Sequence, residues 1–333
     1  MKNQNQPVMC SNAPQSRVAQ LPQASLSRRR MLAASVALPA AGMIVGGMRN
    51  VRAAGHSDGA QPNAIKNTLA LGDFEVSTLL AGTRTVENPQ SIFGMNVSPE
   101  EFAAVSEANF LPTDAAQFFF TPTVVRAGGE VVLFDTGLNA AGITAPLASA
   151  GVAPEEVTIV VITHMHGDHI GGLTGDDGAP TFVNARYVTG QVEYDAWAKQ
   201  DNDNFKSKVQ PLAEKMEFIG DGDSVVSGIT AMAAFGHTPG HMIYMLESGG
   251  KQLVLMADMA NHYVWSLGYP EWEVKFDMDK AKAAETRKKM FDMFTADKIP
   301  FVGYHMPFPG MGYSEARGEG GYRYVPVSYQ MML

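Results

Sequence analysis

The chain has 333 residues, of which 45% are hydrophobic and 18% are charged, and its formal net charge is −9. This composition supports a sizeable buried core and excludes an intrinsically disordered chain, which would hold too little apolar surface to fold. The excess of acidic residues also argues against nucleic acid as a partner, because the chain would repel the phosphate backbone.

Residues 1–53 have the features of an export signal. Ser27-Arg28-Arg29-Arg30-Met31-Leu32 leads into an apolar run that ends at Gly47, and Val51-Arg52-Ala53 has the small-residue pattern of a cleavage site. The segment resembles a twin-arginine signal, so we expect the twin-arginine export machinery as a partner, cleavage after Ala53 and a periplasmic or secreted mature protein. The alternative is a membrane anchor. The apolar run is short, rich in Ala and Gly and contains Pro39, so we expect no stable membrane insertion after cleavage.

Cleavage would change both the charge and the metal chemistry of the chain. Residues 1–53 hold seven basic residues and no acidic one, so their removal makes the net charge more negative by seven. Cys10, the only cysteine, also lies in this segment. A mature chain without cysteine forms no disulfide, and any metal site in it has to use histidine and carboxylate ligands.

The elements predicted after the signal alternate between strands and helices. A polar leader at 54–67 precedes one catalytic domain, 68–333, within which 175–178 and 199–208 are expected surface loops. The apolar runs that predict strands are 74–80, 123–126, 131–134, 157–163, 182–188, 224–233, 242–247 and 252–256. The predicted helices are 141–150, 190–199 and an amphipathic helix over about 279–294. Interleaved strands and helices without an internal linker predict an α/β sandwich with sheets at its centre and helices outside.

A cluster of possible metal ligands follows the strand predicted over 157–163. His164, His166, Asp168 and His169 lie in Thr-His-Met-His-Gly-Asp-His. Residues two apart in an extended chain point to the same side, so His164 and His166 can hold one metal ion together. After the following turn, Asp168 and His169 can face a second ion. Core burial of histidine would not require three imidazoles and a carboxylate within six residues.

Further histidines lie in two short motifs. His237 and His241 belong to Gly-His-Thr-Pro-Gly-His, and His305 belongs to Gly-Tyr-His-Met-Pro. Asp221 and Asp223 in Gly-Asp-Gly-Asp are interpreted as turn residues, because this spacing is typical of hairpin connections.

The order of these residues resembles the metal signature of the metallo-β-lactamase superfamily. The matching residues are His164, His166, Asp168, His169, His237, Asp258 and His305, together with Asp135 in Leu-Phe-Asp-Thr-Gly. The resemblance implies an α/β fold, the four-layer αββα sandwich of that superfamily, and a site for two divalent metal ions. We expect Zn²⁺ in this site, with Mn²⁺, Fe²⁺ and Co²⁺ as alternatives.

The same resemblance assigns a role to each ligand. One ion would be bound by His164, His166 and His237. The other would be bound by Asp168, His169 and His305. Asp258 would bridge the two ions. Asp135 and His241 would lie behind the ligands, where Asp135 braces the loop that carries them.

The two ends of the predicted domain resemble a narrower group, methyl parathion hydrolase and its lactonase-like relatives. The residues are Leu71-Gly72-Asp73-Phe74-Glu75 and Gly-Gly-Tyr-Arg-Tyr-Val-Pro-Val at 320–327. This resemblance implies a small-molecule substrate that is an ester, a lactone or an organophosphate triester, and a homodimer. The segment after Asp135 departs from the pattern, since it is shorter and lacks an aromatic residue of the phosphotriesterase pocket.

Three residues are candidates for the substrate pocket. Trp197 falls where the phosphotriesterase keeps a pocket tryptophan, and Phe205 is a second aromatic candidate. His262 is a candidate because it lies close to Asp258 in the sequence. Each also fits a packing or surface role.

The expected reaction is hydrolysis by a metal-bridging hydroxide, since two divalent ions lower the pKa of a shared water from ~15.7 towards neutrality. Asp168 and Asp258 are the candidate catalytic residues, and Asp168 would position the attacking water. One alternative is a redox enzyme on the same fold, of the di-iron or persulfide dioxygenase type. Di-iron reductases carry Glu at the position of His166, and the dioxygenases use one iron and fewer ligands. A second alternative is a non-catalytic metal-binding protein of the export pathway, although structural zinc sites are closed and usually rich in cysteine.

Overall fold

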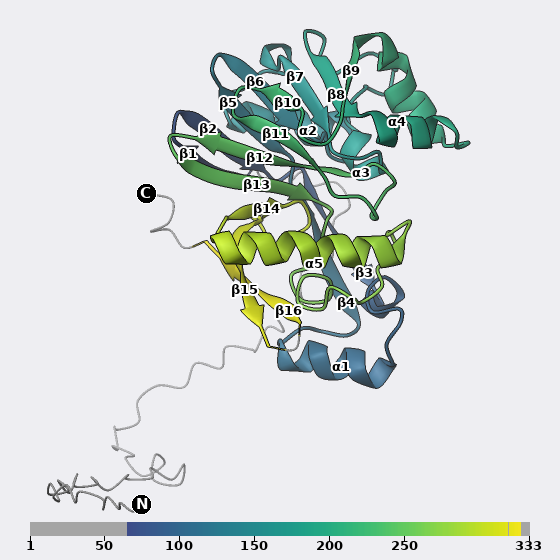
Figure 1. Cartoon of the computed structure of the whole chain (residues 1–333). Coiled ribbons are helices and arrows are strands. Elements are labelled where there is room, and N and C mark those ends of the chain that lie inside the picture. Colours follow the sequence, from purple (N-terminus) through teal and green to yellow (C-terminus); the bar gives the residue numbers. More distant parts are fainter. Residues whose placement is uncertain (1–64, 319, 328–333) are drawn as a thin grey trace, which may run out of the picture. The chain divides into compact units, whose positions relative to one another are not determined.

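The computed structural model describes residues 65–318 and 320–327, and its core is two seven-stranded sheets (Figure 1). The first sheet has the order β1 (Lys66–Leu71), β2 (Phe74–Leu79), β5 (Thr123–Ala127), β6 (Glu130–Phe134), β7 (Ile159–Ile162), β8 (Arg186–Gly190) and β9 (Met216–Ile219). The second has the order β10 (Ser224–Val226), β11 (Ile229–Ala233), β12 (Met242–Ser248), β13 (Lys251–Ala257), β14 (Phe301–Gly303), β15 (Met311–Arg317) and β16 (Gly321–Pro326). β3 (Gly82–Glu87) and β4 (Ala115–Phe120) form a separate two-stranded antiparallel sheet.

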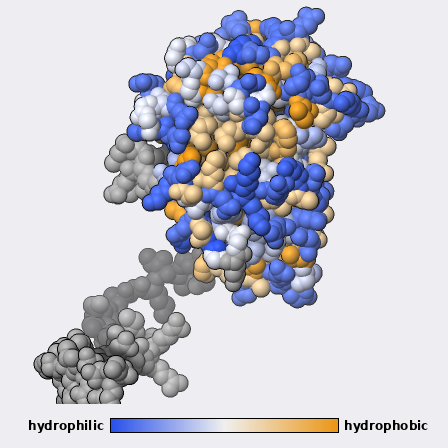
Figure 2. Space-filling model, viewed as in Figure 1, coloured by the Kyte–Doolittle hydropathy of each residue, from blue (hydrophilic) through white to orange (hydrophobic). Residues whose placement is uncertain are grey.

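The helices lie outside the sheets. They are α1 (Pro99–Ala108), α2 (Ala140–Ser149), α3 (Gly167–Ile170), α4 (Gln191–Ala198) and α5 (Lys280–Asp297). Shorter turns are the 3₁₀ helices η2 (Pro89–Ser91), η3 (Pro154–Glu156) and η5 (Gln210–Lys215) and the π-helix η4 (Phe205–Val209). Figure 2 shows hydrophilic residues over much of the face in view, as expected for the outer surface of a sandwich.

Alternating side chains in the strands produce the layers. Val132 of β6 packs between the two sheets with Tyr244 of the second sheet. The next residue, Leu133, points to the opposite face, where it packs with Ile143 of α2. On the outer face of the second sheet, Phe291 of α5 packs in a third cluster. Because successive strand residues face opposite sides, these three clusters form the layers helix, sheet, sheet and helix. The predicted four-layer sandwich is confirmed.

Several boundaries differ from the prediction. β1 begins at Lys66, ahead of the expected start at 68, because Lys66 and Asn67 continue the ladder with β2. The run 224–233 is a hairpin whose two strands are separated by Gly228 at φ +80°. β1, the two-stranded β3–β4 sheet, α1, β9 and the C-terminal strands β14 to β16 were not among the predicted elements. The exposed loop expected at 199–208 contains a buried residue, Phe205, at the start of η4.

The predicted export signal, its cleavage site and Cys10 lie outside the described residues. Within the described part of the chain, no helix combines the length and the apolar character needed to cross a membrane.

Candidate metal centre

The predicted metal ligands lie in loops that follow the ends of strands from both sheets. His164, His166, Asp168 and His169 follow β7 of the first sheet, and His169 lies in the short helix α3. The other three follow β11, β13 and β14 of the second sheet. These three strands run in the same direction, so their carboxyl ends meet at one edge of the sheet. The topology therefore brings residues up to about 140 positions apart to one place.

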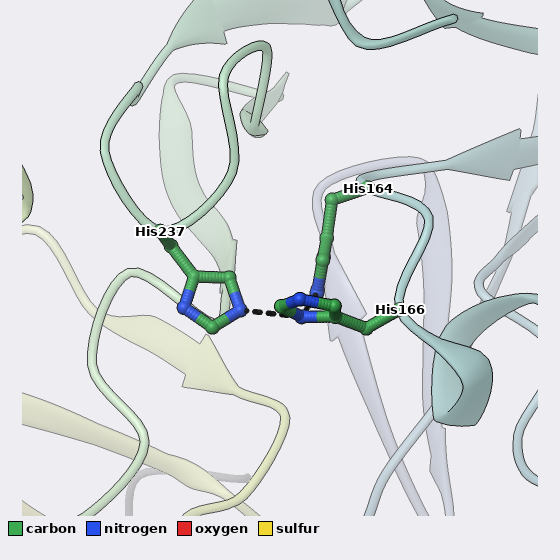
Figure 3. A group of neighbouring side chains, drawn as sticks. All are labelled: His164, His166 and His237. Atoms are coloured by element: carbon green, nitrogen blue, oxygen red, sulfur yellow. Dashed lines mark hydrogen bonds between the residues drawn. The ribbon is translucent and has the colours of Figure 1, made fainter. Parts of the chain in front are cut away.

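The first ligand group consists of His164, His166 and His237 (Figure 3). Nδ1 of His166 lies 3.1 Å from Nε2 of His164 and 3.0 Å from Nε2 of His237. In a tetrahedral site with metal–nitrogen bonds of about 2.0–2.1 Å, neighbouring ligand atoms lie about 3.3 Å apart. The three nitrogens therefore have the spacing of ligands around a single ion.

The second group consists of Asp168, His169 and His305. Oδ2 of Asp168 lies 3.5 Å from Nε2 of His169 and 3.3 Å from Nε2 of His305. These separations again match two ligands of one ion. The mixed oxygen and nitrogen donors suit a divalent transition metal.

Asp258 lies between the two groups. Its Oδ2 is 3.4 Å from Nε2 of His237 and 3.1 Å from Nε2 of His305. Its Oδ1 is 3.2 Å from Nε2 of His169. Both Oδ1 of Asp258 and Nε2 of His169 are buried without a hydrogen-bond partner among the described residues. Because unpaired buried polar atoms are costly, this arrangement fits a centre in which metal ions supply the missing partners.

The electrostatics differ between the two sides of the centre. Burial, reinforced by His237, lowers the pKa of His166 to about 3, so this imidazole is neutral and able to donate a lone pair. Burial would also lower the pKa of His305, but Asp258 and Asp168 outweigh it and raise that pKa to about 10. The carboxylates of Asp168 and Asp258 therefore favour positive charge on this side of the centre.

A family model described as the metallo-beta-lactamase superfamily matches residues 121–298, which hold every predicted ligand except His305. The chain belongs to the metallo-β-lactamase superfamily.

The known relatives of this superfamily member include lactonases. An N-acyl homoserine lactonase from a Bacillus species is 29% identical over 160 residues, 47% of this chain and 60% of that protein. The chain therefore spans about three fifths of the length of this relative. A ribonuclease Z from Methanothermobacter thermautotrophicus is 41% identical over 73 residues, 21% of this chain and 23% of that enzyme.

Two solved structures share the fold at low sequence identity. AidC, a dizinc quorum-quenching lactonase in complex with a product, has a TM-score of 0.74 and 23% identity over 80% of this chain and 99% of its own. The hydrolase AbOPH has a TM-score of 0.73 and 23% identity over 79% of this chain and 98% of its own. These likenesses agree with the metallo-β-lactamase fold.

Outer hydrogen bonds orient the ligands of this metallo-β-lactamase centre. Oδ2 of Asp135 lies 2.8 Å from Nδ1 of His169, and the same carboxylate accepts from the backbone N–H and the hydroxyl of Thr163. Nδ1 of His305 donates to the carbonyl of Phe119 at 2.8 Å. With Nδ1 engaged, each ring presents Nε2 to the centre. Asp135 thus lies behind His169, one of the candidate ligands.

His241 lies beside the centre, and both of its ring nitrogens hydrogen-bond to backbone groups. Its Nδ1 is 3.2 Å from the carbonyl of Ala234, and its Nε2 accepts from the N–H of Asp258. The ring packs 5.0 Å from that of His164. His241 supports two ligand-bearing segments and has no nitrogen left for a metal.

Sequence reasoning missed the partner of His237. Nδ1 of His237 lies 3.0 Å from Oδ1 of Asp277, whose Oδ2 accepts from Nη1 of Arg287 at 2.7 Å. Asp277 and Arg287 are 2% and 1% exposed, so this is a buried ion pair. The sequence signal that could have indicated this ion pair is Arg287 itself, which occupies a position that is otherwise apolar in α5.

Trp197 and Phe205 occupy packing positions in the structure. Both belong to the hydrophobic cluster on the outer face of the first sheet, because α4 and η4 cover that face. The indole ring of Trp197 lies 5.7 Å from the ring of His166, and its Nε1 donates to Glu193 at 2.7 Å. Trp197 therefore packs next to His166, one of the candidate ligands.

Glu193, also unpredicted, joins the two loops that carry the first ligand group. Its Oε1 accepts from the N–H of Met165, between His164 and His166, at 3.0 Å. Its Oε2 accepts from the hydroxyl of Thr238 and from the N–H of Gly240, beside His237, at 2.7 and 2.8 Å. The side chain is fully buried. Burial raises the pKa of this carboxyl, and its donors oppose that shift.

We expect Glu193→Gln to weaken metal binding about 10- to 100-fold, the range for partners that orient ligands. In either orientation, the NH₂ group of the glutamine would face N–H or O–H donors in place of an acceptor oxygen. The hydrogen bonds that join the two loops would then be lost. Competition with a chromophoric chelator measures the metal affinity. Asp195→Asn, which makes the same change on the exposed face of α4, is the control, and equal affinities for the two variants would contradict the role of Glu193.

Proposed function

We propose that this chain is a dinuclear-metal hydrolase that cleaves a lactone, an ester or an organophosphate triester. The observation that carries the proposal is the position of Asp258, whose carboxylate lies within 3.4 Å of ligands from both groups. A carboxylate shared in this way is suited to bridging two ions. The similarity to N-acyl homoserine lactonases favours lactones among the three substrate classes.

The residues present fit such a centre. The first group with Asp258 would hold one divalent cation, and Asp168, His169, His305 and Asp258 would hold the other. When bound, the two cations supply Lewis acidity and lower the pKa of a shared water, and zinc is the metal that we propose.

Asp168 is the residue best placed to handle the proton of the attacking water. Its side chain is 24% exposed, whereas that of Asp258 is 4% exposed. A carboxylate that reaches solvent can orient the water and pass its proton outward. The backbone carbonyl of Asp168 accepts from the hydroxyl of Tyr304, which fixes this segment.

Removal of the metals tests the proposal. Dialysis against a chelator should abolish hydrolysis of a lactone, p-nitrophenyl acetate or methyl parathion, since no serine or cysteine nucleophile is invoked. Two equivalents of Zn²⁺ or Mn²⁺ per chain should restore it. Iron with oxygen consumption would instead favour the redox alternative, and two bound metals without turnover would favour a non-catalytic protein.

Export by the twin-arginine route and homodimer formation are part of the same proposal. The twin-arginine motif before an apolar run supports export, and the resemblance to dimeric relatives supports the dimer. An N-terminus after Ala53 in protein recovered outside the cytoplasm would agree with the first.

A further inference from the structure

Asn261 lies three residues after Asp258, in the loop that follows β13. Its Nδ2 donates to Oδ2 of Asp258 at 2.9 Å. A carboxylate oxygen only accepts hydrogen bonds, so the nitrogen of the amide, and not its oxygen, has to face Asp258. The residue is only 2% exposed. Asn261 therefore holds a buried N–H donor against the carboxylate that lies between the two ligand groups.

The loop around Asn261 is fixed by hydrogen bonds of its own. The hydroxyl oxygen of Ser266 accepts from the backbone N–H groups of Asn261 and His262, at 3.0 and 2.9 Å. Nδ1 of His262 accepts from the N–H groups of Val264 and Trp265, both at 3.1 Å, and its ring stacks on that of Trp265. The sequence candidate His262 thus packs within this loop, and it also lines a pocket of about 320 Å³. These contacts keep the amide of Asn261 in place.

The oxygen of the same amide has no partner. Oδ1 of Asn261 is buried and makes no hydrogen bond with residues 65–318 and 320–327. A buried acceptor without a partner costs free energy. Leucine has a similar branched shape and no polar atom, so it would fill this position without that cost.

The donor gains importance when metals are bound. Nε2 of His305 and Nε2 of His169 lie 3.1 and 3.2 Å from the carboxylate of Asp258. An imidazole nitrogen that binds a metal uses its lone pair and has no proton to donate. In a loaded centre, Nδ2 of Asn261 would be the one hydrogen-bond donor that the described part of the chain offers to this carboxylate.

We propose that Asn261 is a positioning residue of the metal centre, whose amide holds the carboxylate of Asp258 in the orientation that reaches both ligand groups. This inference rests on the proposed two-metal centre. Other candidate ligands have such partners too, since Asp135 orients His169 and the carbonyl of Phe119 orients His305. Without its donor, the carboxylate would be free to rotate about the bonds of its side chain.

Asn261→Leu tests the inference through two measurements that need no substrate. We expect the metal affinity, from competition with a chromophoric chelator, to fall about 10- to 100-fold, the range for partners that orient ligands. The melting temperature of the metal-free protein should stay the same or rise, because the variant loses an unpaired buried acceptor. An unchanged metal affinity would overturn the inference, whatever the melting temperature.

Two control variants separate positioning from a general effect on the fold. Asn67→Leu makes the same substitution in β1, where Nδ2 of Asn67 is buried without a partner among the described residues. It should leave the metal affinity unchanged, and a loss equal to that of Asn261→Leu would reject the inference. Leu147→Ala opens a cavity at a fully buried position of α2 and should lower the melting temperature.

Leu147→Ala decides the case in which Asn261→Leu lowers both the affinity and the melting temperature. Wild-type metal affinity in Leu147→Ala would then support positioning by Asn261, because loss of stability alone would not weaken binding. An equal loss of affinity in the two variants would assign the effect to the fold and overturn the inference.

These measurements also distinguish failure of the inference from failure of the proposed function. If the wild-type protein binds two metals and hydrolyses none of the test substrates, the proposed hydrolysis is wrong, and the affinities still decide the role of Asn261. If the wild-type protein hydrolyses a substrate and Asn261→Leu binds metal as tightly, the inference alone is wrong.

Discussion

Asp258→Ala should abolish hydrolysis and lower the metal content below two equivalents per chain. The carboxylate of Asp258 lies within 3.4 Å of His237, His305 and His169, so its loss affects both ligand groups. Metal ions contribute several kcal/mol of transition-state stabilisation, so we expect kcat to fall more than about 10³-fold. Metal analysis of the purified variant and turnover of the best lactone give the two measurements.

Asp73→Ala is the matched control for this change. Asp73 lies exposed in the turn between β1 and β2, far along the sheet from the ligand loops, so the same deletion there should leave two metals and full turnover. Two bound metals and wild-type turnover in Asp258→Ala would contradict the proposal that the carboxylate of Asp258 bridges two ions.

Arg287→Leu should cause the largest loss of stability among single changes outside the ligands. The guanidinium donates to Asp277 and to the carbonyls of Pro270 and Trp272, all within the core. Removal of one partner from a buried ion pair costs about 3–5 kcal/mol, because the other charge is left uncompensated. For a domain of this size, the melting temperature should fall by about 10 °C. Thermal unfolding of the metal-free protein measures this without a contribution from metal binding.

The adjacent residue of α5 provides the control. Lys288 forms an ion pair with Glu271 at 2.6 Å, but the two side chains are 44% and 71% exposed. Lys288→Leu should therefore leave the melting temperature close to that of the wild type. Equal losses in the two variants would show that the substitution in α5, and not the buried pair, causes the effect.

The candidate metal ligands could be found in the sequence because four of them lie within six residues after an apolar run. Their spacing is a local property, and the others match a family order. Asp277 and Glu193 could not be predicted in this way. Asp277 meets His237 from 40 positions away, and Glu193 meets Gly240 from 47 positions away. A lone acidic residue in the sequence does not indicate which distant donor it will contact.

The fold was predicted where alternation or long apolar runs indicated buried strands. It was missed in β4, whose sequence AAQFFF has three consecutive aromatic residues in place of an alternating pattern. The two-stranded sheet containing β4 belongs to neither large sheet, and Phe118 and Phe120 of β4 pack with α1 and with Trp265. The placement of Trp197 was also unpredictable, because burial behind His166 depends on how α4 crosses the first sheet.

The candidate ligands come from loops of both sheets. Each of the two groups of candidate ligands takes members from both sides of the boundary between β9 and β10. Neither half of the polypeptide therefore contains a complete set of donors. Cations bound there would link the two halves of the sandwich. We therefore expect metal binding to be coupled to the association of the two halves.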